Sequence, residues 1–389
     1  MLHTWLDWQR SLLSSWLELG RLAGASHPLG HLLHPPRELL ARTLAAGTVS
    51  ERPLDQAVKR DAPFPVRAEV IRTSPFVRLV HLQRPGPQRQ RFLLLAPYSG
   101  YATSVISPLA TSLVAMGEVI VTEWTDARLV PLSDGAFGLA EQIAVGLEAA
   151  TALGAPAHLV GLSQSGPTVL ALAAILAEET PALTPASLAF LGCQLDPKVA
   201  PNALQQMLAQ CPRDLLVANL TTTVGSGYPG VGRRVYPSLL QLMAYSMASP
   251  QLYTDVQHGL WRELAAGQSG VYDRQHADIH SLLDVPGELF LEMLDWVLGR
   301  SVWEGDRPVL AGRAHDLAPL RALPVLTLES GQDELVGPGQ THALNHRLRS
   351  PHAQAVTLPD GRHHDLFTGP GFLDGVAPVL WRFYAGQGR

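Results

Sequence analysis

Cysteine and charge are both scarce in this chain of 389 residues. Its two cysteines, Cys193 and Cys211, cannot form the disulfide framework of a small secreted domain, so a reducing compartment suits the composition. Only 16% of the residues are charged, and the net charge is −5. A chain without a basic excess lacks the field that attracts phosphate groups, which argues against a nucleic-acid partner.

Long apolar runs are also absent. The longest unbroken one, residues 169–177, has nine residues, whereas a membrane-spanning helix needs about 20. Charged residues interrupt the apolar ones in the first 24 positions, which lack both the basic start and the hydrophobic centre of a signal peptide. We therefore expect a cytoplasmic location and no transmembrane segment.

Residues 1–65 are expected to form an amphipathic helix followed by a segment that wraps the core. The helical face either packs on the rest of the protein or lies on a hydrophobic surface, such as a lipid layer or a polymer particle, where indole rings suit the boundary with water. No metal site is predicted, because His27, His31 and His34 have no acids or cysteines near them. The apolar residues at helical spacing are Leu2, Trp5, Leu6, Leu12, Leu13, Trp16 and Leu17.

Beyond residue 65 the hydrophobic pattern alternates between strands and helices. Short apolar runs predict strands, and longer stretches with helical periodicity lie between them. This alternation implies right-handed crossovers and a mostly parallel sheet covered by helices on both faces. The predicted strands are 66–73, 77–83, 92–96, 118–124, 157–162, 186–191, 325–329 and 353–358, and the predicted core helices are 104–116, 137–153, 164–179, 339–348 and 371–385.

Residues 196–310 interrupt the alternation. They include helical stretches at 238–248 and 286–298 and are rich in Tyr and Trp. A segment of this length is too long for a loop, so we expect a helical cap, or lid, over the carboxyl edge of the sheet. The cap divides the predicted α/β core into a first part, residues 66–195, and a second part, residues 311–389.

The segment 157–168 (AHLVGLSQSGPT) predicts a buried strand, a tight turn at Ser163 and the start of a helix. A nucleophile at such a turn needs small residues two positions before and after it, and Gly161 and Ser165 meet that need. The backbone N–H of Gln164 would then face any oxyanion formed there. The pattern departs from G-x-S-x-G in carrying Ser165 followed by Gly166, and an ordinary strand–serine–helix turn is the alternative.

Two later strands also end in residues that suit catalysis. Asp333 follows strand 325–329, and His363 follows strand 353–358. The order serine, acid, histidine is that of α/β-hydrolases, and all three residues are expected at the carboxyl ends of parallel strands. We therefore predict an α/β-hydrolase fold with Ser163, Asp333 and His363 as catalytic residues. His364 is the alternative base and Asp196 the alternative acid.

These residues predict ester hydrolysis through an acyl-enzyme. The histidine, oriented by the acid, would deprotonate the serine, which attacks the ester carbonyl, and water would hydrolyse the resulting acyl-enzyme. The oxyanion would be held by the N–H of Gln164 and by one N–H from the loop that contains Tyr98 and Ser99. This chemistry needs no cofactor and no metal.

Six segments spread along the chain form a further pattern. They are 6–10 (LDWQR), 95–100 (LAPYSG), 123–132 (EWTDARLVPL), 163–164 (SQ), 331–341 (GQDELVGPGQT) and 363–369 (HHDLFTG). Together they resemble intracellular poly(3-hydroxybutyrate) depolymerases, and the W-x-D-A-R-x-V-P block is not a generic hydrolase feature. Within that block, Asp126 and Arg128 are expected to form a structural ion pair near the site.

The resemblance implies hydrolysis of a storage polyester to 3-hydroxybutyrate or oligomers, with Ser163 as nucleophile, Asp333 as acid and His363 as base. It also implies a partner, the polymer or the surface of its granule. Many members of the family carry Cys-Gln-Pro where this chain has Ser163, Gln164 and Ser165. A thiolate is already nucleophilic, whereas serine must give its proton to the histidine, so we expect His363 to be strictly required.

Three other functions fit the same residues. A soluble carboxylesterase or thioesterase would share the catalytic residues without acting on polymer. A polyester synthase or acyltransferase would normally carry a cysteine at the turn and consume a CoA thioester. A non-catalytic granule-binding protein would keep the fold and would be indifferent to Ser163→Ala.

Overall fold

The core of the protein is one eight-stranded sheet. The computed structural model describes residues 5, 8, 9, 11–15, 17, 18, 30–45, 53–87, 90–100, 106–300 and 302–386. The core strands are β1 (Arg67–Ser74), β2 (Val77–Gln83), β3 (Arg91–Leu95), β4 (Glu118–Trp124), β5 (His158–Leu162), β6 (Ser187–Leu191), β13 (Val325–Ser330) and β14 (Ala353–Leu358). Their order is β1-β2-β4-β3-β5-β6-β13-β14, with β2 antiparallel to both its neighbours and all other pairs parallel. Each predicted core strand is present.

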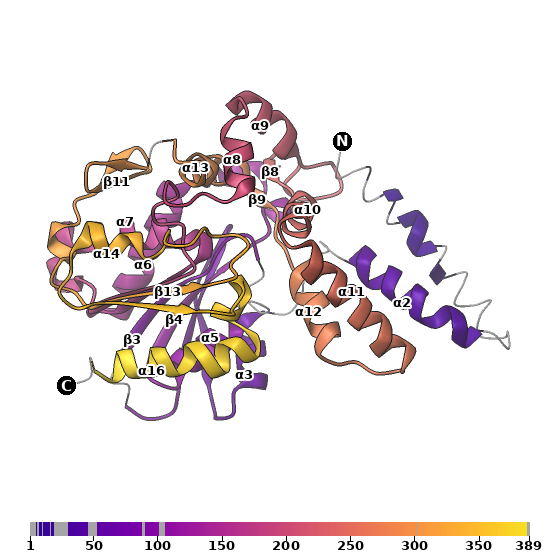
Figure 1. Ribbon diagram of the computed structural model, residues 1–389, viewed down its shortest axis with the longest axis horizontal. Helices are drawn as coiled ribbons and strands as arrows, with labels where there is room; N and C mark the ends of the chain where they lie inside the picture. The colour runs from indigo at the N-terminus through magenta and orange to yellow at the C-terminus, as the bar shows by residue number, and fades with distance from the viewer. Residues whose placement is uncertain are drawn as a thin grey trace.

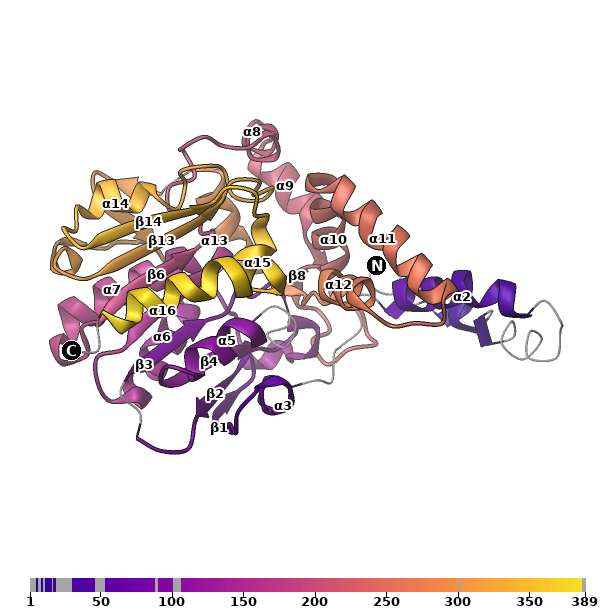
Figure 2. The same ribbon diagram turned by 60° about the horizontal axis from the view of Figure 1, so that its bottom comes forward.

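Helices cover both faces of this sheet. Figures 1 and 2 show α5 and α16 on one face, and α6, α7 and α14 on the other. The central strands β3, β5, β6 and β13 are buried almost throughout, because they lie between the two layers of helices. This arrangement, with a serine turn directly after β5, is the α/β-hydrolase fold. The core helices are α3 (Leu54–Asp61), α5 (Ser107–Val114), α6 (Leu139–Leu153), α7 (Gly166–Glu179), α14 (Ala343–Leu348) and α16 (Ala377–Ala385).

The segment between β6 and β13 forms six helices and, beyond what the sequence predicts, two small three-stranded sheets. Backbone contacts join it to the loop after β3: Gly100 forms an isolated bridge with Leu282, and the N–H of Leu283 donates to the Ser99 carbonyl over 3.0 Å. The segment therefore lies at the carboxyl edge of the sheet. Its elements are α8 (Ala203–Ala209), α9 (Arg213–Leu220), β7 (Thr222–Thr223), β8 (Arg234–Tyr236), α10 (Ser238–Ala248), α11 (Pro250–Ala265), α12 (Val271–His280), β9 (Val285–Pro286), α13 (Gly287–Val297), β10 (Trp303–Glu304), β11 (Arg307–Leu310) and β12 (Arg313–Ala314).

The described N-terminal part packs on two different regions. Helix α2 (Gly30–Ala45) lies against α11, whereas α3 lies against β1 and α5. No helix among the described residues is both long enough and apolar enough to cross a bilayer. Of the predicted apolar face, Trp5, Leu12 and Leu13 are exposed and Leu17 is half-buried, while Leu2, Leu6 and Trp16 lie outside the described residues.

Candidate active site

Ser163 lies at the turn that joins β5 to α7. Its backbone φ is +48°, a left-handed conformation that serine rarely adopts. The turn is tight because α7 starts against the end of β6: a Cβ on Gly166 would stand 2.6 Å from the Sγ of Cys193. This strained geometry is that of a nucleophile elbow, which lifts a side chain out of the sheet. Ser163 itself remains half-buried.

Ser165 has a role that the sequence pattern did not reveal. Its fully buried hydroxyl accepts a hydrogen bond from the N–H of Leu162 over 2.9 Å and donates one to the Leu95 carbonyl over 2.7 Å. The serine turn is thereby tied to the end of β3, where the loop with Tyr98 and Ser99 begins. The only signal in the sequence is a serine at a position where the usual pattern has glycine.

The structure places His363 in contact with both Ser163 and Asp333. The Ser163 Oγ lies 3.0 Å from Nε2 of His363, a residue 200 positions later in the chain. The other ring nitrogen, Nδ1, lies 2.8 Å from Oδ2 of Asp333. The remaining Asp333 oxygen, Oδ1, accepts backbone N–H groups of Leu335 at 2.9 Å and Val336 at 2.8 Å. Both carboxylate oxygens therefore have fixed partners.

His363 and Asp333 shift each other's pKa in opposite directions. Burial disfavours a charged imidazole, but the Asp333 carboxylate, its hydrogen bond and the nearby Glu334 raise the pKa of His363 above its ordinary value. Burial also opposes ionisation of Asp333, yet the charge and hydrogen bond of His363 and two backbone N–H groups lower the pKa of that carboxyl. The pair is thus an ionised carboxylate beside an imidazole suited to accept a proton.

Close packing holds the His363 ring in place. Gly192, just after β6, has φ +56°, and a Cβ there would lie 3.2 Å from Cε1 of His363 and 2.7 Å from Leu366. The Phe367 ring meets the His363 ring edge to face, with 5.4 Å between centroids. His363 is only 2% exposed. Gly192 after β6 and Phe367 of its own turn therefore fix its orientation, together with the hydrogen bond to Asp333.

The two alternative residues have other partners. Nδ1 of His364 lies 3.0 Å from the Tyr245 hydroxyl, and burial together with the neighbouring His363 lowers the pKa of His364 to about 3, against an opposing effect of Asp333. The Asp196 carboxylate accepts Nη2 and Nε of Arg347 at 2.5 and 3.0 Å. Among the described contacts, neither His364 nor Asp196 reaches the Ser163 hydroxyl or the His363 ring nitrogens.

In the loop predicted to hold the oxyanion, the Tyr98 side chain packs in the core. The Tyr98 hydroxyl donates to the Thr125 carbonyl over 2.7 Å, and its ring stacks on Trp124 with 5.2 Å between centroids. Tyr98 is therefore committed to the core, and only its N–H can serve a substrate. Ser99 is half-buried, as is Gln164 directly after the serine.

A buried ion cluster joins the core to the inserted segment. Nη2 of Arg128 contacts Oδ2 of Asp126 at 2.7 Å, which fits the predicted structural pair, and its Nε lies 3.5 Å from Oδ2 of Asp284. The other Asp284 oxygen accepts the backbone N–H of Ser238 over 2.8 Å. Asp284 is the member that sequence reasoning missed, because it is far from the other two along the chain.

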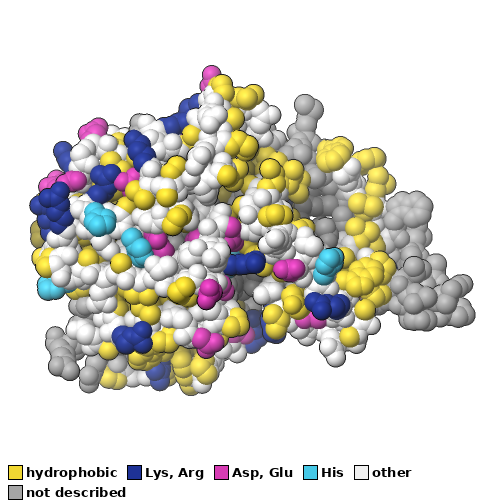
Figure 3. Space-filling model, in the orientation of Figure 1, with side chains coloured by type: hydrophobic (Ala, Val, Ile, Leu, Met, Phe, Trp, Pro, Cys, Tyr) yellow, Lys and Arg dark blue, Asp and Glu magenta, His cyan; other side chains and the backbone are white. Residues whose placement is uncertain are grey.

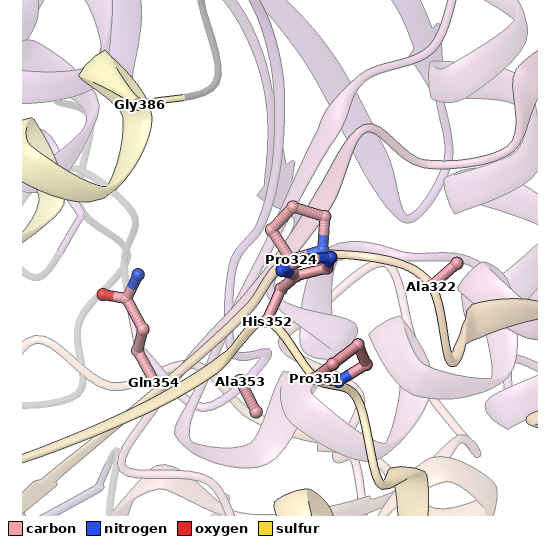
Figure 4. Close-up of a pocket in the computed structure, with 7 residues that line it drawn as sticks. All are labelled: Ala322, Pro324, Pro351, His352, Ala353, Gln354 and Gly386. Carbon is pink, nitrogen blue, oxygen red and sulfur yellow. The ribbon is translucent and has the colours of Figure 1, made fainter.

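A surface hollow of about 580 Å³ lies away from these residues (Figure 4). It sits at the amino ends of β13 and β14, whereas Asp333 and His363 follow their carboxyl ends. Among the described residues, no group of three or more His, Cys, Asp or Glu is placed to hold a metal ion. His27 and the side chains of His31 and His34 lie outside that description. The hollow is lined by Ala322, Pro324, Pro351, His352, Ala353, Gln354 and Gly386.

Known proteins resemble this chain in sequence and in fold. The family model described as PHB de-polymerase C-terminus matches residues 192–387, just over half of the chain. No curated protein sequence matches it. A monoacylglycerol lipase from Paleococcus ferrophilus is similar in structure, with 15% identity and a TM-score of 0.49 over 79% of this chain and 99% of the lipase. A thermophilic esterase from Thermogutta terrifontis shares 14% identity, with a TM-score of 0.42 over 83% of this chain and 100% of the esterase.

Proposed function

Because this chain belongs to the PHB depolymerase family, we propose that it hydrolyses the ester bonds of poly(3-hydroxybutyrate) or a related polyhydroxyalkanoate, with Ser163 as nucleophile. Family and fold together support an ester hydrolase. The observation that carries the proposed mechanism is the pair of contacts at 3.0 Å from Ser163 to His363 and 2.8 Å from His363 to Asp333. In this proposal His363 is the general base and Asp333 orients it.

In the proposed reaction, Nε2 of His363 takes the Ser163 proton as Oγ attacks the ester carbonyl. Asp333, which accepts the Nδ1–H, stabilises the imidazolium that forms. The imidazolium then gives its proton to the alkoxide leaving group, and an acyl-enzyme remains. A water molecule, deprotonated by the same nitrogen, releases the hydroxyacid or oligomer and regenerates the serine.

The N–H of Gln164 and an N–H of Tyr98 or Ser99 would stabilise the oxyanion. Such donors act only if they keep a fixed separation. The Ser165 hydroxyl supports a fixed separation, because it accepts from the N–H of Leu162 in the serine turn and donates to the Leu95 carbonyl, where the loop starts.

We place the substrate polymer, or its granule surface, against the inserted segment, which we assign as the cap. Residues 235–254 carry no charged side chain, and on α10 the side chains of Met243 and Met247 are 51% and 69% exposed. Figure 3 shows hydrophobic side chains gathered over α9, α10 and α11. An uncharged apolar surface suits an insoluble, uncharged polyester. A cytoplasmic location at storage granules follows from the same assignment.

A soluble carboxylesterase or thioesterase is the second candidate. The observation that favours it is Ser163 itself, since many members of the family carry a cysteine there. Such an enzyme would use the same contacts but would not need the exposed face of α10.

Parallel assays separate these functions. Amorphous poly(3-hydroxybutyrate) granules and p-nitrophenyl butyrate are offered to the purified protein, and turbidity, released 3-hydroxybutyrate and p-nitrophenol are measured. The polymer proposal predicts clearing of the suspension with release of hydroxyacid. Rapid hydrolysis of the soluble ester without clearing of the granule suspension would overturn the polymer proposal and favour a soluble esterase.

A further inference from the structure

Helix α10 belongs to the inserted segment, yet it contacts the turn of His363 directly and the loop of Ser99 through Leu283. Helical geometry places residues 241 and 245 on one face and residues 243 and 247 on the opposite one, at about 100° per residue. Gln241 is buried and Tyr245 is half-buried, whereas Met243 and Met247 are exposed. The inner face of α10 is therefore turned toward the carboxyl edge of the sheet.

The first contact of α10 is with the turn that carries the proposed base. The Tyr245 hydroxyl lies 3.0 Å from Nδ1 of His364, and the two rings meet edge to face at 5.4 Å. The rings of His364, His363 and Phe367 contact one another, with centroids 5.4 to 5.7 Å apart. Since His363 and His364 share one short turn, a displacement of Tyr245 is transmitted to the His363 ring.

The second contact of α10 is with Leu283, which in turn binds the loop proposed to stabilise the oxyanion. Nε2 of Gln241 donates to the Leu283 carbonyl over 2.7 Å. The N–H of the same Leu283 donates to the carbonyl of Ser99 over 3.0 Å. A single helix thus connects, through two short hydrogen-bonded routes, the base and the oxyanion donors of the proposed reaction.

We propose that Tyr245 and Gln241 are positioning residues, through which α10 fixes the distance between the His363 turn and the Ser99 loop. The inference rests on the proposed function, because it assigns these residues to that reaction. His364 is the intermediary, because its Nδ1 shares a hydrogen bond with the Tyr245 hydroxyl and its ring contacts that of His363. Burial, with the nearby Glu334, raises the pKa of Tyr245, so its hydroxyl remains a donor at neutral pH.

Removal of the phenol hydroxyl tests this most selectively. For Tyr245→Phe we expect kcat on p-nitrophenyl butyrate to fall about tenfold with KM unchanged, because the reacting groups lose alignment while the substrate contacts remain. His364→Leu should have the same effect, and the double variant should be no slower than either single one, since both remove one hydrogen bond. His364→Gln retains an acceptor oxygen and should recover part of the rate. Gln241→Met should also lower kcat.

The rate at which a fluorophosphonate labels Ser163 provides a second measurement, independent of substrate identity. Tyr272→Phe is the matched control, because Tyr272 packs against Gly259 of α11, outside the site. If wild type is active and is labelled, and the rates of Tyr245→Phe and His364→Leu are both within about twofold of the wild-type rate, the positioning role of α10 is overturned while the proposed function stands. A loss of about 10⁴-fold in His364→Leu would make His364 the base and also overturn that positioning role. If wild type is neither labelled nor active, the proposed function is wrong, and the positioning role of α10 is wrong with it.

Discussion

At the scale of single residues, the central feature is an imidazole whose two nitrogens have different partners. Nδ1 of His363 is 2.8 Å from Asp333 and Nε2 is 3.0 Å from Ser163. The sequence predicts that these three side chains lie close together because each follows a strand, and the carboxyl ends of parallel strands meet at one edge. Sequence reasoning could not find Ser165 or Tyr245, whose contacts join positions 70 and 119 residues apart without any periodic pattern.

The raised pKa of His363 has a consequence for the pH dependence of activity. The base must be neutral in the free enzyme, so kcat/KM should fall as the pH drops through a pKa that lies above the ordinary histidine value of about 6.5. Asp333→Asn removes the charge that raises this pKa, so the acidic limb should move to lower pH and the rate should fall by about 10³ to 10⁴. Profiles measured with p-nitrophenyl butyrate give both quantities. An acidic limb that stays at the same pH in the variant would contradict the assigned role of Asp333.

The hydroxyl of Ser165 is predicted to stabilise the elbow. Ser165→Ala leaves the N–H of Leu162 and the carbonyl of Leu95 buried without this partner, so we expect a loss of about 1 to 3 kcal/mol in the free energy of unfolding. Denaturant titration measures it. Thr151→Ala is the control, since that exposed hydroxyl bonds only within its own helix. Equal stability of the two variants would mean that the buried hydrogen bonds are not needed.

At the scale of elements, a side-chain contact decides where helix α14 begins. Helix α14 begins at Ala343 rather than at the predicted 339, because the Glu329 carboxylate accepts the backbone N–H groups of Gly339, Thr341 and His342 and holds them in a loop. The strands of the inserted segment have two to four residues each, too few to produce an alternating pattern. The core strands have five to eight residues each, long enough for apolar runs or alternating apolar residues to predict them.

The inserted segment is predicted to depend on Arg128 for its attachment to the core. Arg128→Ala leaves Asp126 and Asp284 buried at 2% and 0% exposure with no cation between them, which should cost about 3 to 5 kcal/mol. Thermal unfolding followed by circular dichroism would show it. Arg313→Ala, at the exposed ion pairs with Glu178 and Glu179, should behave like wild type. If both variants unfold together with wild type, the cluster does not hold the segment.

At the scale of the whole molecule, the order of the strands and helices along the chain was predictable, but the contacts between distant elements were not. The alternation of strands and helices, its interruption between β6 and β13, and the α/β-hydrolase fold follow from local patterns. The way in which α10 reaches two distant loops depends on packing among elements that contact one another only after folding. Those contacts carry no local signal in the sequence.

Buried neutral histidines predict a loss of stability in acid. Burial lowers the pKa of His158 and of His276 to about 4, with His280 and Arg42 adding to the effect at His276. Below about pH 6.5 these imidazoles bind protons in the unfolded chain but stay neutral in the folded one. The free energy of unfolding should therefore fall as the pH drops from 6.5 toward 4, by on the order of 3 kcal/mol per histidine. His363, with its raised pKa, acts in the opposite direction. Denaturant midpoints across this range test the slope, and a flat profile would refute it.

The most direct test of the proposed function compares wild type with Ser163→Ala on amorphous poly(3-hydroxybutyrate) granules. Adsorption of the protein is measured by sedimentation, and release of 3-hydroxybutyrate is measured separately. We expect the variant to adsorb like wild type while hydrolysis falls by at least about 10³-fold, because the proposed nucleophile is lost and the apolar face of the inserted segment is intact. Hydrolysis that persists at a comparable rate in Ser163→Ala would contradict it.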